Sequence, residues 1–348
     1  MIEVLRAGLL TSVQDLGRKG YRMSGVCTSG ALDTLALHIA NRLVGNMPEA
    51  AGLEVTAGPV HLHFTQTTRV ALSGADFNAT LDDHPVHAWW SFPVEAGQTL
   101  RLHTPKIGMR AYLAIHGGID VAPMLGSRST DLKAGFGGLN GRALKDGDLL
   151  PLGATRSSIR TSHALQMPAF GIKAPGWHRF EHRNLREENK TSLCGTPGTS
   201  VRVLRGPEYS HFTAAAHEHF WSEPWLITTN SNRMGYRLAG PELTRTKNLE
   251  LLSHAVLPGT IQVPGNGQPI VLMHDAQTTG GYAKIGVVIQ ADLWRLAQAR
   301  LASNLYFTEC TITDARTAYA DLQRYLTQIE FAIDQQYQGY AQSTKAPA

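Results

Sequence analysis

The stretch Pro269-Ile-Val-Leu-Met273, followed closely by Asp275-Ala-Gln-Thr-Thr-Gly-Gly-Tyr-Ala-Lys284, sets the pattern for most of the chain. A short apolar run bounded by proline and polar residues is typical of a buried strand. The loop after it concentrates an acid, an amide, hydroxyls, paired glycines and a lysine. Because glycines let backbone N–H groups approach a ligand closely, this loop is a candidate site. The alternative is an ordinary Gly-rich turn whose Thr and Asp side chains satisfy the local backbone.

Similar short apolar or alternating runs recur in both halves of the chain, bounded by Gly, Pro, Asn or Asp. Many short strands without alternating long helices predict a mainly β protein built from barrels or sandwiches, and not a doubly wound sheet. The expected strands are Ile2–Leu5, Val60–Phe64, Arg69–Leu72, Thr99–His103, Ala111–His116, Val201–Leu204, Trp225–Thr228, Thr260–Val263, Ile270–Met273 and Ile285–Ile289.

Four segments have apolar residues at helical spacing: 30–44, 211–220, 292–301 and 313–333. Ser29 is a plausible N-cap for the first of them, and Gly45 follows its end. These few helices are expected at the periphery of the strands.

The pattern divides the chain into an N-terminal β-rich lobe over 1–153 and a C-terminal β-rich lobe over 201–334. Residues 154–200, rich in Ser, Thr and Arg and poor in apolar periodicity, are expected to form a linker or excursion. The polar end, 335–348, is expected to be a flexible tail.

Composition narrows the class of protein. The 43% hydrophobic and 17% charged residues indicate a soluble globular protein with a sizeable core. The net charge of +4 is scattered, which does not favour nucleic-acid binding and is compatible with small anionic substrates. Three widely spaced cysteines, the absence of a signal-peptide pattern and the absence of a long apolar run predict a cytoplasmic protein that does not enter a membrane.

Three further segments carry candidate binding residues. Ser29 and Gly30 precede the first expected helix, whose N-terminus would favour an anion, and Arg18 lies nearby. Arg128, in the loop Gly126-Ser-Arg-Ser-Thr130, is able to hold a carboxylate through its two-pronged guanidinium. Arg233 precedes a turn. In each case a capped helix, a Gly-rich connection or a braced turn is the alternative.

Several common catalytic motifs are missing from the chain. The histidines include His61 and His63, which share one face of a strand, and His217 and His219, which do not share a helix face. No HExxH, GxSxG or GxxxxGK[ST] sequence occurs, so the chain gives no indication of a metal site, a nucleophile elbow or a phosphate-binding loop.

Blocks of sequence spread over residues 1–330 together resemble the family of 5-oxoprolinase C subunits. This family is also called KipA-like or biotin-dependent carboxyltransferase, and it is related to the second allophanate-hydrolase-type domain of urea carboxylase. The blocks are Ser12–Arg18, Ser29–Asp33, Asn41–Asn46, Ser73–Asp76, Arg110–Ala114, Gly117–Asp120, Gly126–Thr130, Gly135–Gly138, Asn232–Gly235, Pro258–Gln262 and Asp275–Tyr282.

The resemblance implies a cyclophilin-like β-barrel architecture with two β-rich lobes. It also implies that the chain is one component of a complex that opens 5-oxo-L-proline to L-glutamate with ATP, used with Mg²⁺. The implied partners are the KipI-like B subunit of the 5-oxoprolinase complex, hereafter the KipI-like protein, together with its A subunit. Because an unactivated lactam is a poor electrophile, the site must stabilise negative charge on the carbonyl oxygen.

We assign the site residues from these segments. The expected catalytic residues are Asp275, Gln277, Thr278, Thr279 and Lys284. The expected substrate-binding residues are Arg18, Ser29, Gly30, Arg128, Arg233, Gly280, Gly281 and Tyr282.

Two other functions remain compatible with the sequence. In the first, the chain is a biotin-dependent carboxyltransferase that acts on a urea-like or amide substrate. The chain has no Met-Lys-Met biotinylation motif, so biotin would arrive on another protein. In the second, the chain is a non-catalytic antagonist that binds a KipI-like inhibitor of a sensor kinase.

Overall fold

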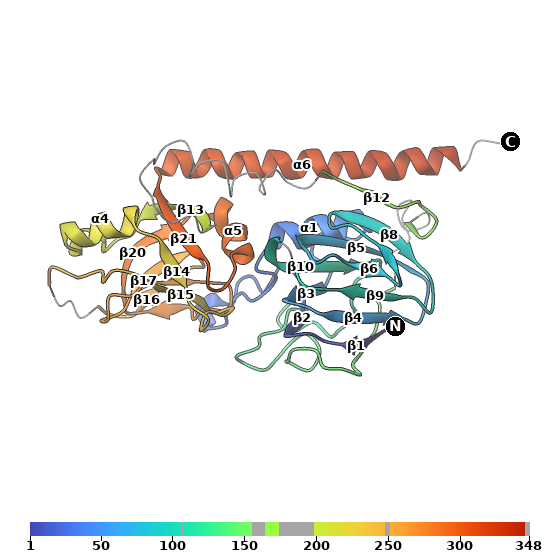
Figure 1. Cartoon of the computed structure of the whole chain (residues 1–348), viewed down its shortest axis with the longest axis horizontal. Coiled ribbons are helices and arrows are strands. Elements are labelled where there is room, and N and C mark those ends of the chain that lie inside the picture. Colours follow the sequence, from blue (N-terminus) through green and yellow to red (C-terminus); the bar gives the residue numbers. More distant parts are fainter. Residues whose placement is uncertain (106, 155–163, 174–197, 248–250, 345–348) are drawn as a thin grey trace. The chain divides into compact units, whose positions relative to one another are not determined.

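The computed structural model describes residues 1–105, 107–154, 164–173, 198–247 and 251–344 (Figure 1). They form two compact units. Unit 1 comprises Met1–Lys19, Ser29–Ala174 and Gln323–Ala348, and unit 2 comprises Gly20–Thr28 and Pro175–Leu322. Both are built mainly from strands, which confirms the mainly β prediction.

Unit 1 consists of two six-stranded antiparallel sheets that share one apolar core. The first sheet has the order β11 (Leu149–Leu150), β1 (Ile2–Arg6), β4 (Val60–Phe64), β9 (Thr99–Leu102), β6 (Thr80–Leu81), β7 (His84–Pro85). The second sheet has the order β12 (Phe170–Gly171), β8 (Trp90–Val94), β5 (Thr68–Asp76), β10 (Ile107–Ile115), β3 (Gly52–Thr56), β2 (Leu10–Gln14).

The period of two in the sequence decides which side chains reach this core. In β4, Val60, Leu62 and Phe64 are fully buried, whereas His61 and His63 lie between them on the outer face. Strand β3 is buried along its whole length. A strand buried in this way has both faces covered, and helix α1 (Thr34–Leu43) packs on the same sheet, where Ser73 donates a hydrogen bond to Ala36 O at 2.7 Å.

Helix α1 begins later than the sequence predicts. Its N-cap is Asp33, whose carboxylate accepts from the Ala36 N–H at 3.0 Å, and its C-cap is Val44. The prediction of Ser29 as N-cap is therefore wrong, because Ser29 and Gly30 both adopt positive φ angles of 50° and 83° that a helix start does not use. Asp is as good an N-cap residue as Ser, and Asp33 immediately precedes the first helical residue, Thr34.

Unit 2 contains a closed seven-stranded barrel (Figure 1). The order is β13 (Gly198–Arg205), β20 (Ala283–Val288), β17 (Thr260–Val263), β18 (Ile270–Leu272), β15 (Gly235–Ala239), β14 (Trp225–Ile227), β21 (Asn304–Glu309). Strand β21 closes the barrel by pairing in parallel with β13, from Gly198 opposite Asn304 to Val203 opposite Glu309. The barrel confirms the expected barrel architecture.

Short elements surround the barrel. Strands β16 (His254–Ala255) and β19 (Thr279–Gly280) form a separate two-stranded sheet. Helix α4 (Ala214–Ser222) packs Phe220 on Phe307 of β21, with ring centroids 4.7 Å apart. The described part of unit 2 also contains α5 (Leu293–Gln298), the 3-10 turns η1 (Arg22–Ser24), η3 (Tyr209–His211) and η4 (Gln290–Asp292), and the beginning of the C-terminal helix.

The C-terminal helix α6 runs from Ile312 to Ser343, well beyond the predicted end at residue 333. Within unit 1, Tyr337 is 1% exposed and donates a hydrogen bond to Leu43 O at 3.0 Å. The side chains of His38 and Glu330 approach to 2.8 Å. The prediction of a flexible tail is therefore wrong up to residue 344, because contacts with Leu43 and His38 of α1 hold this part of α6 in place. Residues 345–348 lie outside the described residues.

The structure also moves the domain boundaries. Unit 1 extends to Ala174 and takes in the end of α6, and residues 20–28 belong to unit 2. Of the expected linker 154–200, residues 155–163 and 174–197 lie outside the described residues. The described part includes β12, which pairs with Ser91 and Trp90 of β8. Before β12, the backbone carbonyls of Ala164, Met167 and Pro168 accept hydrogen bonds from the buried guanidinium of Arg69. None of the described helices combines the length and apolar character that a bilayer crossing requires.

Candidate functional site

A buried lysine lies at the end of the Gly-rich loop in unit 2. Lys284 is in β20 and is 3% exposed. Its ammonium donates to the Tyr282 carbonyl at 3.0 Å and to the Gly280 carbonyl at 3.4 Å. The carboxylate of Glu208 accepts from the Lys284 backbone N–H at 2.9 Å and lies 4.0 Å from its Nζ. Burial lowers the pKa of Lys284, and the charge of Glu208 opposes that shift.

Gln262 of β17 is the cross-strand neighbour of Lys284 in the adjacent strand β20. Its side chain is 1% exposed, and in the described part of the chain its amide nitrogen has no hydrogen-bond partner. A Cβ at Gly280 would come within 2.5 Å of that nitrogen, so the glycine is what lets the loop pack here. A buried N–H donor without a partner is costly, and such groups are typical of ligand sites.

Sequence reasoning missed both Gln262 and Glu208 as site residues. Gln262 interrupts the apolar strand Thr260-Ile-Gln-Val263, and a polar residue at a core position is the signal that indicates it. Glu208 follows Gly206-Pro207 in a turn and is distant from the loop in sequence, so only the fold brings it to Lys284.

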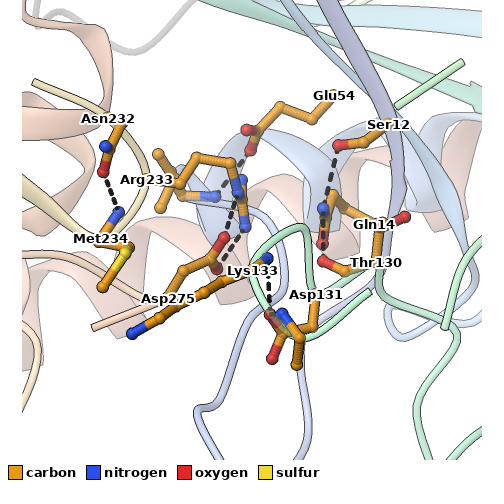
Figure 2. A network of polar contacts seen from close by, with 12 residues as sticks. Ser12, Gln14, Glu54, Thr130, Asp131, Lys133, Asn232, Arg233, Met234 and Asp275 are labelled. Atoms are coloured by element: carbon orange, nitrogen blue, oxygen red, sulfur yellow. Dashed lines mark hydrogen bonds and ion pairs between the residues drawn. The ribbon is translucent and has the colours of Figure 1, made fainter. Parts of the chain in front are cut away.

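Asp275 and Arg233 are brought together, but as partners of each other. The Arg233 guanidinium donates to the two Asp275 carboxylate oxygens at 2.9 and 3.0 Å, and both side chains are at most 3% exposed (Figure 2). The Asp275 backbone N–H also donates to Arg233 O at 3.1 Å. The pair therefore fastens the loop after β18 to the turn before β15, a role that differs from the direct catalytic and substrate contacts that we expected.

The rest of the loop is open. Gln277, Thr279 and Tyr282 are exposed, and Thr278, Gly280 and Gly281 are half-buried. Thr279 and Gly280 form β19, and the Thr278 carbonyl accepts from Val256 N at 3.0 Å. The loop thus exposes Gln277 and Thr279, while the carbonyls of Gly280 and Tyr282 hold the lysine.

The candidate residues of unit 1 gather around the buried carboxylate of Asp15. It accepts from the backbone N–H groups of Gly17 at 2.8 Å and Arg128 at 2.6 Å, and from the hydroxyl of Ser127 at 2.7 Å. Arg18 is 1% exposed and donates to the carbonyl of Ser129, which also donates its hydroxyl to Asp15.

Packing, more than ligand access, explains several of these residues. The Arg18 guanidinium lies 4.4 Å above the Phe136 ring. A Cβ at Gly30 would come within 2.7 Å of Gly17 N, so that position requires glycine. Arg128 is 41% exposed, with Nε donating to Val121 O at 2.9 Å and Nη2 3.6 Å from the Asp120 carboxylate. Because Ser29 and Gly30 do not begin a helix, the predicted helix-dipole anion site is wrong.

A second buried network of unit 1 centres on Glu54, 1% exposed. Its carboxylate accepts from the Leu32 N–H and the Tyr112 hydroxyl, both at 2.8 Å, and lies 3.7 Å from Arg110 Nε. Burial, followed by the charges of Glu54 and Asp33, raises the pKa of Tyr112 well above its ordinary value. The Tyr112 hydroxyl accepts from Asp33 N, which links this network to the cap of α1.

Figure 2 shows further polar contacts of the same kind, in which Gln14 donates to the Ser12 hydroxyl at 3.0 Å and to Thr130 O at 3.2 Å. No group of three or more His, Cys, Asp or Glu side chains with the geometry of a metal site occurs among the residues that the structure describes.

Comparison with known proteins identifies the family. A model of the carboxyltransferase domain, subdomains A and B, matches residues 24–309. The chain is 47% identical over 333 residues to the 5-oxoprolinase C subunit of Escherichia coli (strain K12), covering 96% of this chain and 99% of that protein. It is 38% identical over 335 residues to the 5-oxoprolinase C subunit of Haemophilus influenzae (strain ATCC 51907 / DSM 11121 / KW20 / Rd), with coverages of 96% and 99%.

A solved structure agrees with this assignment. The crystal structure of the K. lactis urea amidolyase superposes with a TM-score of 0.80 at 32% identity over 94% of this chain, which spans about a fifth of that protein, 20% of its length. The fold, the matched family model and the near full-length relatives together show that the chain belongs to the carboxyltransferase-domain family, and within it lies alongside the 5-oxoprolinase C subunits.

Proposed function

We propose that this chain is the C subunit of a 5-oxoprolinase complex, which opens 5-oxo-L-proline to L-glutamate at the expense of ATP. The observation that carries the proposal is the 47% identity to a 5-oxoprolinase C subunit over nearly the whole length of both proteins. The more distant likeness to urea amidolyase supports a shared chemistry, since a lactam and a urea both present a carbonyl bonded to nitrogen.

The chemistry requires donors that stabilise a developing oxyanion. In unit 2, Lys284 Nζ and the Gln262 amide nitrogen are a buried cation and a buried N–H donor on adjacent strands of one barrel. A buried charge is screened less than one in water, so it acts more strongly on a nearby oxyanion. We assign these two residues the role of polarising the lactam carbonyl, with Asp275 and Arg233 positioning the loop that covers them.

ATP, used with Mg²⁺, is part of this proposal as a substrate of the whole complex. The chain has no GxxxxGK[ST] sequence, and the described residues hold no cluster of carboxylates suited to a metal ion. We therefore assign nucleotide binding to another protein of the complex. The partners would be the KipI-like protein and the 5-oxoprolinase A subunit, in the cytoplasm.

Reconstitution tests this function. The chain, the KipI-like protein and the A subunit, purified separately, should form glutamate from 5-oxoproline and ATP only when all three are combined. Lys284→Ala and Gln262→Leu should each lower the rate by about 10²-fold while the complex still assembles, because each removes one of the two assigned oxyanion donors and one lost donor costs about that much. Full activity without this chain would refute the proposal. A bicarbonate-dependent reaction with an avidin-reactive partner would favour carboxyltransfer, and binding to the KipI-like protein without any turnover would favour the antagonist role.

A further inference from the structure

Glu208 bridges the buried lysine and a surface histidine. Its Oε2 lies 4.0 Å from Lys284 Nζ, and its Oε1 lies 3.9 Å from His254 Nε2. Exposure rises in the same order along the three side chains, at 4% for Lys284, 10% for Glu208 and 46% for His254. The carboxylate is therefore the only charged group that the structure places within 4.0 Å of both partners, among the described residues.

Each member of this row is held in place by the backbone. The Lys284 N–H donates to Glu208 Oε2 at 2.9 Å, which fixes the carboxylate beside β20. His254 lies in β16 opposite Gly280, whose carbonyl accepts from the Lys284 ammonium. The His254 Nδ1 lies 3.1 Å from Leu252 O, a contact that leaves Nε2 facing Glu208. A neutral imidazole that donates through Nδ1 has Nε2 free to accept a proton from water.

We propose that His254 and Glu208 form a proton path from solvent to Lys284. The proposal rests on the proposed function for the identity of the proton's destination. When the lactam C–N bond breaks, the departing nitrogen takes the bonding electron pair and needs a proton. Lys284 supplies that proton from Nζ and becomes a neutral amine. The imidazolium of His254 then passes a proton through Glu208 to Lys284, and His254 regains its own from water.

The chemistry of the three groups suits this direction of transfer. Burial lowers the pKa of the Lys284 ammonium from its ordinary value, which makes the ammonium a better proton donor than an exposed lysine. The same burial cuts Lys284 off from solvent, so reprotonation needs intermediate groups. The exposed imidazole of His254 has two ring nitrogens and is able to take a proton from water and pass one on. The two gaps of about 4 Å are the span of one bridging water or a small side-chain rotation.

The first experiment follows the Lys284 ammonium directly and does not depend on any enzymatic activity. In the purified chain with ¹⁵N-labelled lysine, NMR measures how fast the Nζ hydrogens exchange with water. We expect His254→Gln and Glu208→Gln each to slow this exchange about tenfold or more. A buried ammonium exchanges its hydrogens only through groups that connect it to water, and each variant removes one of those groups. The control His84→Gln removes an exposed histidine of unit 1 and should leave the exchange unchanged.

The second experiment uses the reconstituted complex. His254→Gln should lower kcat for glutamate formation without raising KM, and added imidazole should restore most of the loss. Glu208→Gln, which keeps an acceptor for the Lys284 N–H, should lower kcat without imidazole rescue. Unchanged Nζ exchange in both variants would overturn the path, as would a kcat loss in His254→Gln that imidazole leaves untouched. If no complex made glutamate, the proposed function would fail, whereas the exchange rates would still decide the path.

Discussion

The ion pair between Arg233 and Asp275 offers a test of how burial sets the strength of an interaction. We expect Asp275→Ala to destabilise unit 2 by about 3–5 kcal/mol. The guanidinium of Arg233, 3% exposed, would lose its opposite charge and two charge-assisted hydrogen bonds of 2.9 and 3.0 Å. Each such bond contributes about 1.5–3 kcal/mol, so the two together contribute about 3–6 kcal/mol, a range that includes this estimate.

The chain contains a matched control for this experiment. Arg205 and Glu309 make a two-pronged pair of the same kind in the same unit, with contacts of 2.5 and 3.1 Å, but the side chains are 57% and 44% exposed. Glu309→Ala should therefore destabilise unit 2 far less than Asp275→Ala does, because water solvates the remaining arginine. The difference between the two variants isolates the effect of burial from that of geometry.

Thermal and urea unfolding, followed by circular dichroism and tryptophan fluorescence, measure both variants. For a unit of this size the loss in Asp275→Ala corresponds to roughly 6–20 °C in Tm. The double variant Arg233→Met with Asp275→Leu should recover much of the stability, since it removes both charges of the pair together. Equal losses in Asp275→Ala and Glu309→Ala, or a loss below about 1 kcal/mol in Asp275→Ala, would refute the reasoning.

Three further predictions concern other parts of the chain. Lys284→Ala should lower glutamate formation by the complex about 10²-fold while circular dichroism shows that the chain still folds, and a normal rate would exclude Lys284 from the site. The hydrogen bond from Arg142 is the main reason why the pKa of Asp148 is lowered in the folded protein. The ionised Asp148 therefore stabilises the fold at pH values above the ordinary pKa of 3.8, and this stabilisation is lost as the pH falls through the lower folded pKa. Asp148→Asn should thus destabilise the protein at pH 7 and make progressively less difference toward pH 2, as urea unfolding over that range would show; a constant difference would contradict the sign. Tyr337→Ala should destabilise unit 1 by about 3–5 kcal/mol, because a buried aromatic ring and its hydrogen bond to Leu43 O are lost, and hydrogen exchange would show α1 less protected. Unaltered protection would mean that the end of α6 does not support α1.

Local patterns in the sequence were enough to predict the strands. Val60–Phe64 and Thr260–Val263 are strands with the predicted bounds, because alternation of side chains and flanking turn residues are properties of a few neighbouring residues. The mainly β class follows from the number of such runs. The positions of the four helical segments were also predicted, although a cap was misplaced in the first and the end of the last was set too early.

Tertiary contacts decided how far α6 extends and that the segment around Phe170 belongs to unit 1. The sequence after residue 335 is polar and shows little apolar periodicity, so only the packing of Tyr337 beside α1 reveals that the helix continues there. Arg69 binds three carbonyls of residues 164–168 from nearly a hundred residues away, and no local pattern contains that information.

For the site, the sequence determined where the chemistry is concentrated, because a strand followed by acid, hydroxyl, glycine and lysine residues is visible in one short stretch, 275–284. Which of those residues face each other was decided by the barrel. Closing the sheet sets Gln262 opposite Lys284, brings in Glu208 from a distant turn, and joins Asp275 to Arg233. Pairing across strands depends on register and burial over the whole barrel, and those are properties of the folded chain that neighbouring residues do not carry.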